Sequence, residues 1–107
     1  SWAICLNVMQ YIPIQYEFFA LNNIYTSFSK GLIISWADRD EEDVLKGYVN
    51  CRNQSEVIAL LKNMLGYHLM DEETDKLRAA VTVNESLRRN LLVFRRLWLR
   101  QTSSTWS

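Results

Sequence analysis

The sequence predicts an all-α fold, a compact single-domain bundle of five or six short helices. Two observations favour this class: apolar residues recur at helical spacing, and helix-capping residues precede several segments. With 3 Gly and 1 Pro in 107 residues, the composition is not that of a disordered chain. Because 49% of the residues are hydrophobic, one domain with one modest core accounts for the chain. We expect a single helical domain over residues 1–101 and a flexible C-terminal tail over residues 102–107.

The first two expected helices lie on either side of Pro13. Between residues 2 and 12, apolar residues have helical spacing, and Pro13 ends or kinks this segment because it lacks a backbone donor. A second helix over residues 15–28 has an apolar stripe made by Phe18, Leu21, Tyr25 and Phe28. Gly31 suits its end. Residues 32–34 fit either a short strand or a buried connector, since Leu-Ile-Ile is apolar and β-branched.

The middle of the chain predicts two helices that begin with polar caps. The acidic run at residues 38–43 suits a helix start, where carboxylates meet the positive end of the helix dipole, so we expect a helix to about Val49. Ser55 is the expected cap of the next helix, which ends near Gly66. The apolar face of that helix consists of Val57, Leu60, Leu61, Met64 and Leu65.

The last two expected helices begin at Asp71 and at residue 82. Asp71 caps a short helix that runs to Ala80. Residues 82–85, Thr-Val-Asn-Glu, form a capping box for a final amphipathic helix that extends to about Arg100. The apolar stripe of this final helix is formed by Leu87, Leu91, Phe94 and Trp98.

The residues needed for catalysis or metal binding are scarce. His68 is the one histidine, and Cys5 and Cys51 are far apart in sequence, which leaves no spacing typical of a zinc site or of a Cys–His pair. The acidic run has no central Gly and no alternating ligands for calcium. We therefore predict no catalytic residue, no metal site, no cofactor and no small-molecule substrate. The two cysteines suit buried thiols in an intracellular protein, although a single bridge between them stays open.

Charge is unevenly distributed along a chain whose formal net charge is zero. Residues 1–75 carry 11 acidic and 5 basic side chains, whereas residues 76–107 carry 7 basic side chains and Glu85 alone. On the expected final helix, Arg88 and Arg95 share one face, and a second stripe lies beside it. This second stripe is made by Arg89, Arg96 and Arg100.

These features predict a non-catalytic protein–protein interaction domain, an adaptor or assembly module that binds a partner or itself. The 4 Trp, 5 Tyr and 4 Phe exceed what a core of this size can bury, and exposed aromatics and Arg dominate interface energetics. The expected partner-binding residues are Arg88, Arg89, Arg95, Arg96, Arg100 and Tyr67. The alternative is a nucleic-acid-binding helical domain that contacts phosphates through the Arg stripes. The apolar stretch at residues 2–12 is too short to span a membrane.

One segment resembles a known family. Residues 60–77 read LLKNMLGYHLMDEETDKL, which resembles the join between two EF-hands, where the exiting helix ends in Leu-Gly and the next begins with an acidic turn. The following loop at residues 81–86 lacks the carboxylate spacing and the Gly of a calcium loop. The resemblance therefore implies a degenerate EF-hand pair without calcium, retained as a protein-binding pair of helices.

Overall fold

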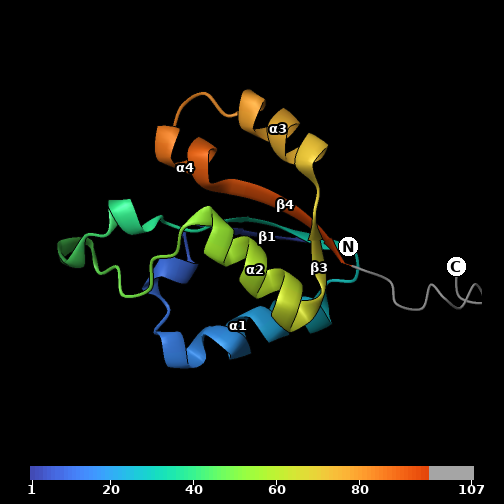
Figure 1. The fold of residues 1–107 in the computed structure, drawn as a ribbon, viewed down its shortest axis with the longest axis horizontal. Coiled ribbons are helices and arrows are strands. Elements are labelled where there is room, and N and C mark those ends of the chain that lie inside the picture. The colour runs from blue at the N-terminus through green and yellow to red at the C-terminus, as the bar shows by residue number, and fades with distance from the viewer. Residues whose placement is uncertain (97–107) are drawn as a thin grey trace, which may run out of the picture.

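The computed structural model describes residues 1–96, and these residues form a mixed α/β structure in place of the expected all-α bundle. A four-stranded sheet lies between two groups of helices (Figure 1). The strands are β1 (Trp2–Leu6), β2 (Gly31–Ser35), β3 (Tyr67–Leu69) and β4 (Leu91–Arg96). The helices are α1 (Ile14–Ser27), α2 (Gln54–Leu65), α3 (Asp71–Ala80) and α4 (Glu85–Asn90). Arg100, Trp98 and the expected tail at residues 102–107 lie outside the described residues.

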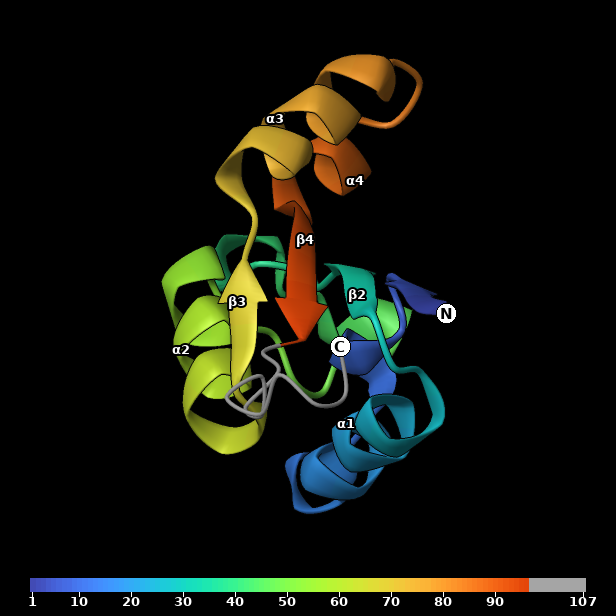
Figure 2. The ribbon, with the colours of Figure 1, turned by 90° about the vertical axis from the view of Figure 1, so that its right-hand side faces the viewer.

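The strand order in the sheet is β1-β2-β4-β3. β1 and β2 are parallel and are connected through α1, whereas β4 runs antiparallel to both of its neighbours, β2 and β3. Figure 2 shows α1 and α2 on one side of the sheet and α3 with α4 on the other. The first side holds the main core, because the inward side chains of the strands meet α1 and α2 there. This core includes Leu21, Leu32, Ile34, Leu61 and Phe94.

The N-terminal segment is a strand, so the helix expected between residues 2 and 12 is wrong. In β1, residues alternate between exposed and buried, and Ala3 and Cys5 are the two that face the core. Every residue of β1 is apolar, so the alternation leaves no period-2 signal in the sequence. Beside it, residues 32–34 form the inner part of β2, which is the strand alternative for that stretch.

The C-terminal segment corrects the expected final helix. α4 covers only Glu85–Asn90, and the side chain of Asn84, not Thr82, caps it by accepting a 2.9 Å hydrogen bond from the Leu87 N–H. From Leu91 the chain is strand β4, the pairing partner of both β2 and β3. Four consecutive residues of β4, 91–94, are buried. A helix at the surface would bury only one of its faces. Four consecutive buried residues instead indicate an inner strand, whose side chains are covered on both faces of the sheet.

The segments around α2 contain two further corrections and one confirmed prediction. The acidic run forms a three-residue 3₁₀ turn, Arg39–Glu41, followed by a second at Val44–Lys46, in place of the expected helix to Val49. Asn53, not Ser55, caps α2. Gly66 ends α2 as predicted, with a left-handed φ of 72° that favours glycine. Between α2 and α3 the chain forms the short edge strand β3.

Candidate functional site

The arginines expected to form a partner-binding face do not share one. Arg88 and Arg89 lie on α4, whereas Arg95 and Arg96 lie on β4, and the helix that was to align them ends at Asn90. Arg88 pairs with Glu85 on its own helix, and Arg89 pairs with Glu41 at 2.7 Å. Because these two guanidiniums already have carboxylate partners, they are poorly placed to dock an acidic partner or a phosphate.

The two strand arginines point to different surroundings. Arg96 lies over the ring of Tyr25, 3.9 Å from its centroid, and donates a 3.2 Å hydrogen bond to the Tyr25 carbonyl oxygen. Arg95 is exposed and stands opposite Gly31 on β2 and His68 on β3. Arg96 therefore fastens β4 to α1, and Arg95 is the one of these four arginines whose side chain is exposed without a described ion pair.

Tyr67 is a core residue, so the prediction that it contacts a partner is wrong. Its side chain is 1% exposed and packs edge-on against Tyr25, with ring centroids 5.7 Å apart. Burial raises the pKa of Tyr67 to about 12. Its hydroxyl has no hydrogen-bond partner among the described residues. A tyrosine in this position contributes packing of the ring and offers no accessible contact surface.

The sheet also separates the residues that a Cys–His pair would need. Cys5 is on β1 and His68 is on β3, at opposite ends of the strand order. Three strand spacings of about 4.8 Å each put the two strands roughly 14 Å apart. Cys5 and Cys51 are free and buried, and burial raises the pKa of each thiol.

Exposed apolar side chains are concentrated in the β1–α1 region. Within residues 1–96, nine of the fourteen large hydrophobic side chains that are exposed belong to residues 2–19. These nine are Trp2, Ile4, Leu6, Val8, Tyr11, Ile14, Tyr16, Phe18 and Phe19. In the fold they lie on two surfaces, because Trp2, Ile4 and Leu6 project from the face of the sheet opposite the core that α1 covers. Exposed apolar surfaces mark binding sites. This region is the strongest candidate for a functional surface in the described part of the chain.

One part of this surface lies on the side of the sheet that carries α3, and we call it the open face. It consists of the outward side of β1 and the residues next to it on β2, β4 and α3. Trp2, Ile4 and Leu6 project from β1 with 38%, 67% and 38% of their surface exposed. A hollow of about 460 Å³ adjoins Trp2. It is lined by Trp2, Ile33, Glu73, Lys76, Leu77 and Val93. α3 covers the β4 side of this face, whereas no described helix covers the β1 side.

The backbone of β1 is also open along one edge. The Asn7 N–H donates to the Ser35 carbonyl, and the Lys30 N–H donates to the Ser1 carbonyl, so the odd-numbered residues of this segment point their polar groups at β2. Backbone groups alternate in direction along a strand. The N–H and C=O groups of Trp2, Ile4 and Leu6 therefore point away from β2, where the sheet has no further described strand.

The outward side of α1 supplies the other part. α1 buries Glu17 and Leu21 against the rest of the fold, whereas Phe18 and Phe19 are 45% and 67% exposed. Residues 18, 21, 25 and 28, the expected apolar stripe, are therefore not equally buried: Leu21 lies in the core, whereas Phe18 is exposed. Phe19 points away from the core side of the helix, since residues 17 and 21 define the buried side.

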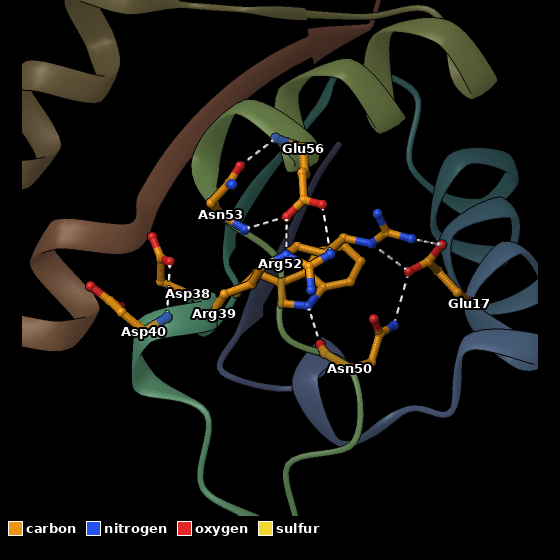
Figure 3. A network of polar contacts seen from close by, with 9 residues as sticks. Glu17, Asp38, Arg39, Asp40, Asn50, Arg52, Asn53 and Glu56 are labelled. Atoms are coloured by element: carbon orange, nitrogen blue, oxygen red, sulfur yellow. Dashed lines mark hydrogen bonds and ion pairs between the residues drawn. The ribbon is translucent and has the colours of Figure 1, made fainter.

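A buried polar network fixes α1 beneath the carboxyl ends of β1 and β2 (Figure 3). Glu17, 5% exposed, accepts hydrogen bonds at 2.9 Å and 3.0 Å from Arg52 and a third, at 2.9 Å, from the Asn50 side chain. Trp36 donates its indole N–H to the Asn50 carbonyl at 2.7 Å, and Arg52 lies 5.6 Å from the Trp36 ring. Both oxygens of this carboxylate have donors, so the network holds the structure together and has no vacant group for a ligand.

Glu41 is the centre of a second polar cluster, which holds α4. Burial raises the pKa of Glu41, but hydrogen bonds from the Ser86 hydroxyl, the Asp38 N–H and the Asn90 side chain outweigh burial, so the pKa is lowered overall. Arg89 also lowers it. Within the described residues, Glu41 of the acidic run and Arg89 of the basic second half form an ion pair in this cluster.

The open face and open edge were not predicted from the sequence because both depend on β1 being a strand. The aromatic excess was a usable signal, but it does not say which aromatics are exposed. Residues 1–96 contain no helix with the length and apolar character needed to cross a bilayer, and no group of three or more His, Cys, Asp or Glu placed to hold a metal ion. Comparisons of the chain with protein-family models, with curated proteins and with solved structures found no match.

Proposed function

We propose that this chain is a non-catalytic assembly module that binds another polypeptide through the apolar surface of β1 and α1. The observation that carries the proposal is the concentration of exposed apolar side chains in residues 2–19, together with the unpaired edge of β1. Burial of apolar surface is the main favourable term in protein association, and a row of free backbone groups adds directional hydrogen bonds.

The structure supports a protein partner better than a nucleic acid. Residues 1–29 contain no Lys or Arg, whereas phosphate binding requires basic side chains. Of the arginines considered for that role, Arg88 and Arg89 are ion-paired and Arg96 is stacked on Tyr25. Arg95 is exposed without a described ion pair, and Lys76 lines the hollow beside Trp2, but two basic side chains are fewer than the basic patch that nucleic-acid binding calls for.

Site-specific photo-crosslinking tests the proposal. A photoreactive residue replaces Ile4, Phe19 or, as a matched control, Val83, which is 94% exposed and lies outside the surface. We expect discrete protein adducts at Ile4 and Phe19 that still form when the crosslinking is carried out in about 1 M salt, because salt does not screen apolar contacts. The Val83 control should give none. The proposal fails if Ile4 and Phe19 give no adduct, or if all three positions give the same ones.

A further inference from the structure

We infer that the partner of α1 is a second copy of this chain, whose own α1 packs against it around a two-fold axis beside Phe19. The inference rests on the proposed assembly function and names the partner of its α1 surface. It is carried by the composition of that surface. Phe19, Tyr16 and Phe18 are 67%, 55% and 45% exposed, and no charged side chain is exposed on the helix.

The exterior of α1 is uncharged, which is unusual for a helix on the outside of a protein. Of the 12 basic and 12 acidic side chains in the chain, residues 1–29 contain Glu17 alone. Glu17 is 5% exposed and accepts hydrogen bonds from Arg52 and Asn50, so its charge is held inside the fold. The outward side of a surface helix usually carries charged residues. The centres of protein–protein interfaces are instead depleted of charge and enriched in aromatic residues, which is the composition of this helix exterior.

Phe19 lies at the centre of the outward side of α1. Because Glu17 and Leu21 define the buried side, residues 15, 19, 22 and 26, which are three or four positions apart, lie opposite to it. Tyr16 and Phe18 flank Phe19, one on each side of this row. Figures 1 and 2 show α1 at the margin of the fold, and no other described element lies beyond it. Another molecule can therefore reach the whole outward side of the helix.

A surface that packs against its own copy has to be complementary to itself. Charges near a two-fold axis meet their own copies, and contacts between like charges are unfavourable. α1 has no such charges, and its exposed polar side chains, among them Gln15, Asn23 and Thr26, are amides and hydroxyls. These groups both donate and accept hydrogen bonds, so they can pair with the same groups of a second copy. The exterior of α1 therefore fits its own copy and needs no partner of opposite charge.

The two-fold axis also determines how the helices run. Two copies of α1 related by an axis perpendicular to the helix pack antiparallel, so the positive end of one helix dipole adjoins the negative end of the other. Phe19 is the sixth of the 14 residues of α1, close to its middle. The two Phe19 rings therefore come within reach of each other at the axis, with the amide side chains around them.

The area of this contact predicts a dimer that depends on concentration. A fully buried aromatic side chain removes about 150–250 Å² from water, so the three aromatic residues, each about half exposed, supply roughly 300 Å² per copy. With the polar side chains around them, two copies bury on the order of 1,000 Å², at the lower limit for a specific interface. An interface of this size fits a dimer with a dissociation constant on the order of 10 µM.

Sedimentation of the purified 107-residue chain between about 1 and about 500 µM tests the inference. We expect the mass to rise from 12.6 kDa toward twice that value, and equally at low and high salt, because the contact contains no charge. Phe19→Glu should weaken the dimer at least about tenfold, since it places two carboxylates at the axis. The matched control is Leu45→Glu, because Leu45 is 98% exposed on a separate 3₁₀ turn. This control should dimerise like the parent.

A pair of variants with opposite charges tests the two-fold axis itself. Phe19→Glu and Phe19→Lys should each be monomeric, whereas an equimolar mixture should form a mixed dimer at low salt, because opposite charges then meet at the axis. Both variants should fold, as circular dichroism can verify, since residue 19 is 67% exposed. The inference is overturned if the parent stays monomeric up to about 500 µM, if Phe19→Glu dimerises like the parent, or if the two folded variants do not associate.

Photo-crosslinking at Phe19 distinguishes failure of this inference from failure of the assembly function. With the purified chain alone, a photoreactive residue in place of Phe19 should give one adduct of twice the mass of the chain. If Phe19 crosslinks to a different polypeptide and never to its own chain, the second copy is the wrong partner and the assembly function stands. If neither Ile4 nor Phe19 gives an adduct, the assembly function itself fails.

Discussion

The first and the last strand of the described chain differ in how completely they are covered. The last strand, β4, pairs on both sides, and its residues 91–94 are at most 4% exposed. The first strand, β1, pairs on one side only, and three of its five residues are exposed by 38% or more. Both strands are apolar throughout most of their length. The difference teaches that β4 uses its apolar residues for stability, whereas β1 leaves three of its own exposed to solvent.

The largest expected loss of stability among the alanine substitutions comes from truncating a buried side chain of β4. Phe94→Ala removes a side chain that is 0% exposed and leaves a cavity between the sheet and α2, so we expect the free energy of unfolding to fall by about 3–5 kcal/mol. Ile4→Ala on β1 removes a side chain that is 67% exposed and should cost under about 1 kcal/mol. Urea unfolding of both variants measures the contrast. Similar losses at the two positions would mean that β1 is as important to the core as β4.

The second prediction concerns the connection of α1 to the rest of the fold. Arg52→Ala leaves the Glu17 carboxylate buried without its bidentate partner, and we expect a loss of about 3 kcal/mol. The double variant Glu17→Gln/Arg52→Ala removes the stranded charge and should regain part of that loss. Arg88→Ala breaks an exposed pair and should leave stability nearly unchanged. Equal effects of Arg52→Ala and Arg88→Ala in thermal melts would contradict a structural role for the buried pair.

The third prediction concerns β2, the strand that lies between β1 and β4. A Cβ placed on Gly31 would lie 2.3 Å from the Phe94 carbonyl oxygen and 2.5 Å from the Trp2 ring. Since the first contact is with backbone, Gly31→Ala must shift β2 against β4, and we expect a loss of about 1–3 kcal/mol. Adding Trp2→Ala removes the ring contact but leaves the backbone contact, so recovery in urea unfolding should be partial. Complete recovery would show that Trp2 alone excludes a side chain at residue 31.

The sequence predicted the helices of this fold better than its strands. The apolar face of α2, its Gly66 terminator and a short helix from Asp71 to Ala80 were predicted correctly, but the expected caps were wrong: Asn53 caps α2, and no side chain caps α3. The strands were mistaken for helices because β1 and β4 have no polar alternation to mark a period of two. Whether an apolar run is a helix or a strand depends on which segment it pairs with, and that partner is distant in sequence: β2 pairs with β4 across about sixty residues.

The candidate site was limited by the same ambiguity. Arg88 and Arg95 are one helical repeat apart, but the chain turns from α4 into β4 at Leu91, so the spacing no longer places them together. The uneven distribution of charge along the sequence was informative in a different way. Part of the acidic excess in residues 1–75 is neutralised by basic residues of the later part, as in the ion pair of Glu41 with Arg89. Local patterns could not show the open edge, which exists only once the sheet is assembled.

A smaller effect is expected from pH at the start of α2. The Arg39 side chain and the Asn53 N–H donate hydrogen bonds to Glu56 and lower its pKa to about 2 from the ordinary 4.5. A lowered carboxylate pKa stabilises the fold above the unfolded pKa, and this contribution disappears as pH falls from about 4.5 to about 2. NMR titration of the Glu56 carboxyl carbon should show this midpoint. In Arg39→Ala the midpoint should move up toward 4.5, and an unmoved midpoint would mean that Arg39 does not hold the carboxylate.

The smallest expected effect on stability belongs to Ile4→Lys, and it sharpens the comparison most. If β1 holds its outward side chains available for a partner, a lysine at residue 4 extends into solvent from a position that is 67% exposed and changes the unfolding free energy by about 0.5 kcal/mol or less. The same change at Leu92, 3% exposed on β4 and part of the core, buries a charge and should unfold the protein. Circular dichroism with urea titration distinguishes the two. A severe loss at Ile4 would mean that the open face already packs against part of this chain, and the surface would then be core.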